Sequence, residues 1–260
     1  MGAGALRAGV ILRSRQSGRM RYLGPAGCER RMSLRSNLHV HSLHSDGSFS
    51  VDDIVAEAKR GGLQAVAITD HFETQKVRRC LSSEGLDDYL NEIREAQRRS
   101  ANGLRVLAGV EIDTNADRCD LASLPVQKLN QLDLVLFEYV NDESNGGSSV
   151  VELDPLLSKL EVPCGLVHTD VERVFAGISP RDLANLLQSY NLFVEANTAS
   201  LYQRDGRQYF ELAERHFQAF KGKVKVSVGT DAHRTLSEVS NVAKGYEFLD
   251  RLGLLGDLVL

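Results

Sequence analysis

The segment "NLHVHSLHSDGS", residues 37–48, carries His39, His41, His44 and Asp46. His39 and His41 are two residues apart, and in a β-strand such residues point to the same face. Both imidazoles could therefore bind one partner. Imidazole and carboxylate groups are common ligands of divalent transition metals. The segment thus predicts part of a metal site, which other parts of the chain would have to complete.

More residues of these types end other strand-like segments, in "AITDH", "GVEI", "GLVH" and "GTDAH". A single histidine at a strand end is more often a structural residue, and an aspartate there is commonly a helix N-cap. So many unpaired polar groups would, however, be costly to bury together, and bound cations would compensate. A set of ligands that contains imidazoles and carboxylates but no thiolate favours Zn, Mn or Fe(II). These candidates are Asp70, His71, Glu111, His168, Asp231 and His233.

The positions of these residues depend on strands that alternate with helices. Short apolar or β-branched runs predict seven strands, and 3.6-residue periodicity with caps predicts the helices. Ser50 is expected to be an N-cap, and Ser179 followed by Pro180 marks another helix start. The predicted strands are 37–42, 65–69, 105–112, 132–140, 164–168, 192–197 and 224–230, and the helices are 50–62, 86–101, 179–190, 207–220 and 237–252.

This alternation predicts an α/β fold with parallel strands. An open, doubly wound sheet and a closed barrel both satisfy the pattern. In a parallel barrel all carboxyl ends of the strands open onto one face, where active sites are built. Residues that are far apart in the sequence would meet there. No GxGxxG motif follows a strand, which argues against a dinucleotide site.

The composition is that of an ordinary globular protein, with 42% hydrophobic and 25% charged residues among 260. The sequence contains no run of eighteen apolar residues, which a transmembrane helix would need, so no membrane association is expected. Four scattered cysteines form no CxxC pair, which argues against a thiolate zinc site and favours the cytoplasm. Residues 37–260 hold 23 basic and 34 acidic residues, which argues against broad nucleic-acid binding.

Residues 1–36 have a different composition, with eight arginines and one acidic residue, Glu29. They show no hydrophobic periodicity and no sustained apolar stretch of a secretory signal. We expect them to be a disordered extension or to precede the true start at Met32, with a targeting segment as the alternative. The chain is therefore divided into an extension, 1–36, and a single domain, 37–260.

The motifs of the domain resemble those of the polymerase-and-histidinol-phosphatase (PHP) superfamily. "HVHSLHSDGS" resembles its opening motif, and "AITDH", "GVEI", "GLVH" and "GTDAH" resemble the later ones. The resemblance covers residues 37–260. It implies a distorted (β/α)7 TIM-like barrel, with two or three divalent ions, Zn, Mn or Fe, whose bound hydroxide hydrolyses a phosphate ester.

Position by position, the resemblance implies a set of ligands, and it leaves Asp70 as a residue that supports a neighbouring ligand. His44 matches a variable position, and His216 lies in a predicted helix, so neither is expected to bind metal. The implied ligands are His39, His41, Asp46, His71, Glu111, His168, Asp231 and His233.

One position departs from the family pattern, at the end of the fourth predicted strand. The family usually has a histidine there, whereas this chain reads "LFEYVNDES". Either Glu138 substitutes for the histidine, or Val140 occupies the position and one metal site is weakened or lost. Both alternatives stay open at this point.

A phosphate substrate predicts arginines near the same face, because guanidinium groups bind phosphate bidentately. Arg234, beside His233, is the first candidate, followed by Arg204 and Arg207 with Asn197, and then by Arg173. Each arginine has the alternative of being an ordinary surface residue.

Three functions remain open. A small phosphomonoester, as for a histidinol phosphatase, is favoured because the connection 70–104 is too short for the inserted domain of nucleotide-type members. The "SDG" motif favours instead a nucleotide phosphatase or a 5′–3′ exonuclease on short oligonucleotides. A non-catalytic protein that binds metal or phosphate is the third. An amidohydrolase is disfavoured, because no lysine ends a central strand.

Overall fold

The computed structural model describes residues 11–13, 20–23, 29–30, 35–100 and 103–260. The chain divides into two units, Met1–Leu34 and Arg35–Leu260. In the first, β1 (Ile11–Arg13), β2 (Met20–Leu23) and β3 (Glu29–Arg30) form an antiparallel sheet. Most of the predicted extension lies outside the described residues, so its disorder and the start at Met32 stay predictions.

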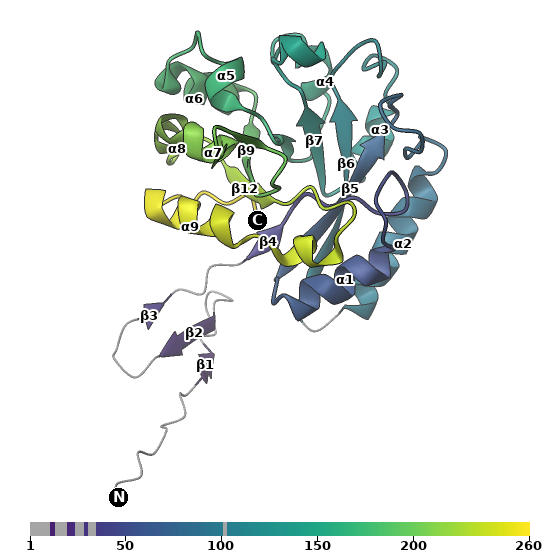
Figure 1. Cartoon of the computed structure of the whole chain (residues 1–260). Coiled ribbons are helices and arrows are strands. Elements are labelled where there is room, and N and C mark those ends of the chain that lie inside the picture. The colour runs from purple at the N-terminus through teal and green to yellow at the C-terminus, as the bar shows by residue number, and fades with distance from the viewer. Residues whose placement is uncertain (1–10, 14–19, 24–28, 31–34, 101–102) are drawn as a thin grey trace, which may run out of the picture. The chain divides into compact units, whose positions relative to one another are not determined.

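Seven strands of the second unit form one sheet, in the order β12-β9-β8-β7-β6-β5-β4, and every neighbouring pair is parallel. Figure 1 shows β5, β6 and β7 side by side, with α1 and α2 outside them. The strands are β4 (Ser36–Asn37), β5 (Ala65–Phe72), β6 (Arg105–Asp113), β7 (Leu134–Glu138), β8 (Cys164–Leu166), β9 (Leu192–Asn197) and β12 (Val226–Gly229).

The two edge strands, β4 and β12, meet and almost close the sheet. The Leu38 amide donates to the Val228 carbonyl over 2.9 Å, and Val40 forms a parallel bridge with Ala232. The distorted TIM-like barrel of seven strands is therefore confirmed. The alternative, an open doubly wound sheet, is not what the chain forms.

Helices connect the strands, and their ends follow the sequence signals. The Ser50 side chain accepts from the Asp53 amide and Asp53 in turn binds the Ser50 amide, which completes a capping box at α1. Ser179 caps α6 before Pro180, as predicted. The helices are α1 (Val51–Arg60), α2 (Leu86–Arg99), α3 (Val126–Leu129), α4 (Asp154–Leu157), α5 (Val171–Val174), α6 (Pro180–Ser189), α7 (Tyr209–Leu212), α8 (Glu214–Phe220) and α9 (Ala243–Leu252), with 3-10 turns η1 (Glu143–Asn145) and η2 (Leu236–Ser240).

The first predicted strand and the last predicted helix were wrong in extent, because side chains or turns take over backbone interactions. The predicted strand 37–42 has regular pairing only at Ser36–Asn37, since the Asn37 side chain accepts from the His39 amide over 3.1 Å. The predicted helix 237–252 is divided into η2 and α9. The Asn241 carbonyl between them accepts from the Thr198 hydroxyl over 2.8 Å.

The predicted helix 207–220 was also wrong at its start. Residues 203–208 form a hairpin of β10 (Gln203–Arg204) and β11 (Arg207–Gln208), and only then do α7 and α8 follow. Asp205 and Gly206 connect the two strands, with φ of 53° and 73°. An Asp-Gly pair with both φ positive is the preferred two-residue hairpin turn, which outweighs helix propensity here.

The barrel interior changes character along the strands. At their amino ends Ala67, Leu107, Leu136 and Phe193 belong to one buried apolar cluster. Side chains alternate between the two faces of a strand, so positions an even number of residues further on also face inward. These later interior positions are His71, Glu111, Glu138 and Glu195, and all are buried.

None of the described helices is long and apolar enough to cross a membrane.

Candidate metal centre

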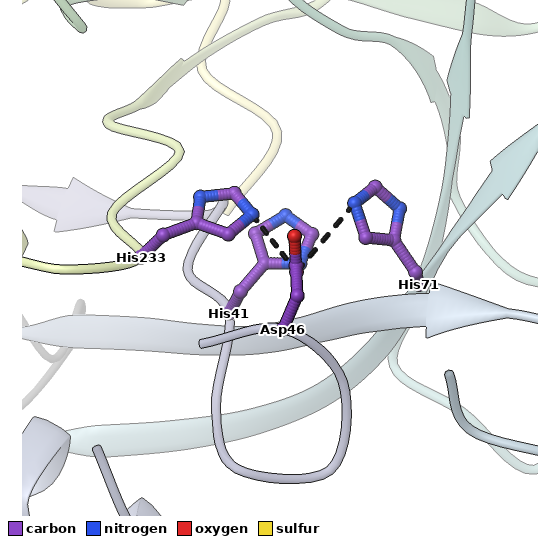
Figure 2. Close-up of side chains that lie close together, drawn as sticks. All are labelled: His41, Asp46, His71 and His233. Carbon is purple, nitrogen blue, oxygen red and sulfur yellow. Dashed lines mark ion pairs between the residues drawn. The ribbon is translucent and has the colours of Figure 1, made fainter. Parts of the chain in front are cut away.

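The first of three clusters joins His41, Asp46, His71 and His233 (Figure 2). Asp46 Oδ1 lies 3.1 Å from His233 Nε2, 3.8 Å from His71 Nε2 and 3.9 Å from His41 Nδ1. The residues come from the loop after β4, the end of β5 and the loop after β12. The predicted convergence of residues distant in sequence is therefore confirmed.

The second cluster joins His39, His41, Glu111 and Asp231. The Nε2 atoms of the two histidines are 3.1 Å apart and lie 3.2 and 3.0 Å from Asp231 Oδ1, while each lies 3.4 Å from a Glu111 oxygen. Four ligands around one tetrahedral zinc, with Zn–N bonds of about 2.1 Å, are separated by about 3.4 Å. The spacing of these atoms therefore suits a shared ion.

The third cluster joins His71, Glu111 and Glu138, with His168 beside it. His71 Nδ1 lies 3.0 Å from Glu111 Oε2 and 3.7 Å from Glu138 Oε1. His168 Nε2 lies 2.9 Å from Glu111 Oε1 and 3.8 Å from Glu138 Oε2. Of the two alternatives that the sequence left open at β7, Glu138 faces this cluster, whereas Val140 packs in the apolar core.

Several buried polar atoms of the clusters lie close to other candidate ligand atoms but form no hydrogen bond of acceptable geometry among the described residues. Leaving a buried polar atom unpaired typically costs about 1–3 kcal/mol, and more when it is charged. Metal coordination would satisfy such atoms, and mixed imidazole and carboxylate ligands suit Zn, Mn or Fe(II). The residues therefore fit a bound metal. The atoms are Asp46 Oδ1, His71 Nδ1, Glu111 Oε2 and Glu138 Oε1.

The histidines of the clusters differ in the direction in which their surroundings shift their pKa values. Burial and the neighbouring imidazoles of His71 and His233 lower the pKa of His41 to about 4, so it is neutral at pH 7. Burial also opposes protonation of His233, but the neighbouring carboxylates of Asp46 and Asp231 outweigh this and raise its pKa to about 9. An entering metal ion would therefore displace a proton from His233.

Glu195 supports the centre from β9, and the sequence analysis did not identify it. Its carboxylate lies 3.1 Å from His39 Nδ1 and accepts from the His168 amide over 2.8 Å and from Asn197 Nδ2 over 2.9 Å. Burial opposes protonation of His39, but the charges of Glu195 and Glu111 outweigh it and raise its pKa well above the usual value. Such a partner fixes which histidine nitrogen faces a metal.

Asp70 holds the loop that carries the first cluster. It is fully buried and accepts from the Ser42 amide over 2.8 Å and from the hydroxyls of Ser42 and Ser45 over 2.6 and 2.5 Å. The Ser45 hydroxyl lies 3.4 Å from His41 Nδ1. Asp70 thus reaches His41 through Ser45, an arrangement that supports the predicted supporting role.

The backbone is strained where two of the candidate ligands lie. His168 has φ of 36° and Asp231 has φ of 49°. Residues other than glycine rarely adopt positive φ, and such strain concentrates at functional sites.

A cavity of about 130 Å³ lies beside His168 and is lined by Tyr139, Tyr202, Asp170 and Arg173, among others. The Tyr202 ring stacks on the His168 ring with centroids 4.3 Å apart. A larger cavity, of about 370 Å³, lies away from the clusters, next to the amino ends of β8 and β9. We consider the smaller of these two cavities as the candidate substrate pocket, because it is the one lined by His168, a candidate ligand.

The four candidate arginines differ in their distance from this pocket. Arg173 lines it and forms an ion pair with Asp142 at 2.6 Å. Arg204 forms an ion pair with Asp170 at 3.0 Å, whereas Arg207 is exposed and donates to the Glu211 carbonyl. Arg234 is exposed beside His233. Their predicted contact with substrate stays a prediction, as does that of Asn197, whose amide is buried against Glu195.

The two histidines that were expected to be outside the site lie outside the clusters. His44 contacts Glu92 at 2.7 Å, with its ring edge-to-face against Tyr89. His216 is buried in α8 and lies 3.2 Å from Glu172.

The chain is similar in sequence to known proteins. The family model "PHP domain" matches residues 37–235. A protein described as "Probable phosphatase" from Caldicellulosiruptor saccharolyticus is 26% identical over 203 residues, which are 78% of this chain and 81% of the relative. The DNA polymerase/3′-5′ exonuclease PolX of Bacillus subtilis is 37% identical over 84 residues, 32% of this chain but only 15% of the polymerase.

A solved structure supports the fold. The histidinol phosphate phosphatase of Lactococcus lactis, complexed with zinc, L-histidinol and phosphate, aligns with a TM-score of 0.61 and 16% sequence identity. The alignment covers 85% of this chain and 94% of that protein.

Proposed function

We propose, from the premise that this chain belongs to the PHP domain family, that it hydrolyses a phosphate ester at a centre of divalent metal ions. The favoured substrate is a small phosphomonoester. The likeness to a histidinol phosphatase fold and the relative described as "Probable phosphatase" support this class of reaction.

The observation that carries the proposal is the convergence of imidazoles and carboxylates whose buried polar atoms lack hydrogen-bond partners among the described residues. An apolar or hydrogen-bonded interior would be the usual filling of a barrel of this size. A cluster that is complete only with bound cations is the more economical account. Zn, Mn and Fe(II) all suit the ligands, in a number of two or three.

We assign the metal-ligand role to the eight residues predicted from the sequence. Glu138 faces His71 and lies near His168, but its carboxylate is paired with the ammonium group of Lys76. The ligands of the proposal are His39, His41, Asp46, His71, Glu111, His168, Asp231 and His233.

Bound divalent ions would supply Lewis acidity and a lowered pKa of water at neutral pH, which is the chemistry that phosphate-ester hydrolysis needs. The protein contributes the orientation of the ligands. Glu195 holds the proton of His39 on Nδ1, so that Nε2 is free to bind, and Asp70 fixes the loop of His41 and Asp46 through Ser42 and Ser45.

The pocket beside His168 supports a small leaving group. Its volume of about 130 Å³ is below the range of roughly 300–1,000 Å³ that is usual for drug-sized ligands. Tyr139, Tyr202 and Tyr209 supply apolar walls, and Arg173 supplies a guanidinium group at its edge. A nucleotide base with its ribose would have to extend out of this cavity.

A nucleotide phosphatase or a short-oligonucleotide exonuclease is the second candidate. The local identity to a polymerase/exonuclease supports it only weakly, because the match covers a small part of that enzyme. The non-catalytic alternative has no comparable support, since the relatives named above are enzymes by description.

The test is phosphate release from a panel of histidinol phosphate, a mononucleotide, a nucleoside 3′,5′-bisphosphate and a short oligonucleotide. The protein is assayed with added Mn²⁺ and, in parallel, with EDTA. Metal-dependent release from histidinol phosphate or another small monoester supports the favoured substrate class. Release only from nucleotides would favour the second candidate, and no release from a metal-loaded protein would contradict both.

Arginine variants then test the pocket. Arg173→Ala is expected to raise KM or lower kcat/KM several-fold if Arg173 contacts the phosphoester. Arg234→Ala tests the same role for the arginine beside His233. Arg251→Ala, in α9, is the matched control, because Arg251 forms a surface ion pair with Glu214. Unchanged kinetics would remove the arginine concerned from the site.

A further inference from the structure

We propose that the ammonium group of Lys76 is the resident cation of the third cluster, so that the centre takes two divalent ions, both in the other two clusters. This inference rests on the proposed metal centre and fixes its stoichiometry. The sequence analysis did not consider Lys76, which lies in the connection after β5.

Lys76 reaches the third cluster from the connection between β5 and α2. Its Nζ donates to Glu138 Oε2 over 2.5 Å, and Glu138 itself is fully buried. The Lys76 side chain is only 25% exposed. The carboxylate that stands where a histidine was expected therefore already has a cation as its partner.

The surroundings hold Lys76 in this place. Its ammonium lies 5.0 Å from the centroid of the Tyr139 ring, and the guanidinium of Arg118 lies at the same distance from that ring. The Lys76 amide donates to the Thr74 hydroxyl over 3.0 Å, and that hydroxyl donates to Asp113 at the end of β6 over 3.3 Å. A lysine held at both backbone and ammonium group is unlike a mobile surface lysine.

The other clusters have no such partner. Within the described residues, no lysine or arginine forms an ion pair with Asp46, Glu111, Asp231 or Glu195. Among the carboxylates around the clusters, Glu138 is the one that pairs with a lysine. An opposite charge stabilises a buried carboxylate, whereas a second cation beside the ammonium group would be repelled. The third cluster is thus compensated by the chain itself, and the first two need ions.

These contacts indicate which clusters bind metal ions. The first cluster, around Asp46, and the second, around Asp231, each have three or more ligand atoms without a charged side chain of opposite sign other than histidine. They share His41, so the two clusters adjoin each other. Two closely spaced metal ions are an arrangement that enzymes of phosphoryl transfer use.

The test counts metal ions per chain. The full-length protein is stripped with EDTA, reloaded with Zn²⁺ or Mn²⁺, freed of excess metal and analysed by mass spectrometry. Two ions per chain are expected for the wild type. Lys76→Met, which keeps the length of the side chain and removes its charge, is expected to bind three. The double change Lys76→Met with Glu138→Gln is expected to return the count to two.

Two further variants keep the test decisive if Lys76→Met folds poorly by thermal melting. Glu138→Gln alone is expected to keep two ions, because Glu138 binds Lys76 and not a metal; loss of an ion would overturn the inference. Lys128→Met is the control, because Lys128, in α3, pairs with Asp87, in α2, and neither residue belongs to the three clusters. This variant should leave the count of metal ions at two.

The outcomes for the wild type separate this inference from the proposed function. A count of three or of one overturns the role of Lys76 and leaves the metal centre in place. A count of zero removes the metal centre itself. A count of two for folded Lys76→Met also contradicts the inference, since the third cluster would then hold no ion even without the ammonium group.

Discussion

Glu195 is expected to determine which nitrogen of His39 faces the second cluster, and replacing it by glutamine tests this role. One side of the carboxylate meets His39 Nδ1 at 3.1 Å. The other accepts from the His168 amide and from Asn197 Nδ2, at 2.8 and 2.9 Å. A carboxylate can accept on both sides, but glutamine has one accepting oxygen and one NH₂ group.

Either orientation of the glutamine amide loses at least one hydrogen bond that the carboxylate makes. If its oxygen faces His39, its NH₂ group meets the donors of His168 and Asn197. If its oxygen faces those donors, its NH₂ group meets His39 Nδ1, which must then accept. The proton of His39 moves to Nε2, the nitrogen that faces the cluster, and blocks metal binding there.

The size of the effect follows from the lost hydrogen bond. An unsatisfied buried partner costs about 1–3 kcal/mol. Since about 1.4 kcal/mol corresponds to a tenfold change in affinity, Glu195→Gln should weaken metal binding roughly 10- to 100-fold. The residue is buried, so the variant should also be somewhat less stable without metal.

The assay is competition between the protein and a chromophoric chelator for Zn²⁺. Glu57→Gln is the matched control, because Glu57 is also buried but pairs with Arg60 in α1, away from the clusters. The control should bind Zn²⁺ like the wild type. Wild-type affinity for Glu195→Gln would refute the reasoning, provided that thermal melting shows both variants folded.

Three further predictions concern the second cluster and the first. Asp231→Asn should lose bound metal and phosphate release while circular dichroism shows an intact fold; full activity would contradict its role. A Cβ on Gly229 would lie 1.7 Å from Glu195 Oε1 and 2.6 Å from His39 Cβ. Gly229→Ala should therefore weaken Zn²⁺ binding and destabilise the fold by about 1–3 kcal/mol, seen as a lower melting temperature. The pKa values of His39 and His233 are raised, to about 9 for His233, so both histidines carry protons at pH 7 that a metal ion must displace. Metal binding at pH 7 should therefore release protons, and the affinity should increase as the pH rises towards 9. Calorimetric heats of binding that do not depend on the ionisation enthalpy of the buffer would contradict this.

Much of the fold was predictable because it depends on local signals. The seven strands were recognisable as apolar runs, and Ser50 and Ser179 marked helix starts through their capping interactions. The hairpin at Asp205 and Gly206 was missed although an Asp-Gly pair is a strong hairpin signal. It was overlooked because it stands directly before residues with helical periodicity.

The candidate ligands were predictable for a different reason. They follow the strands at their carboxyl ends, so parallel pairing alone brings them to one face. Glu138, the last residue of β7, was left as one of two alternatives, and Glu195, in β9, was not identified. The two-residue alternation could have decided for Glu138 and found Glu195, since each follows an interior apolar residue, Leu136 or Phe193, by two positions.

Lys76 could not be predicted in this way. It lies in an irregular connection, where no periodicity tells which way a side chain points. Its contact with Glu138 depends on the course of the loop and on the ring of Tyr139, from the end of another strand. Contacts of this kind come from tertiary packing, for which the local sequence carries no signal.

The measurement that tests the central claim most directly is phosphate release from a small phosphomonoester as metal is returned to the EDTA-stripped protein. Bound ions per chain are counted at each step of the titration. The account predicts no release from the stripped protein, and release that appears as the clusters around Asp46 and Asp231 fill. Release that persists without bound metal, or no release from any phosphomonoester when the ions are bound, would contradict it.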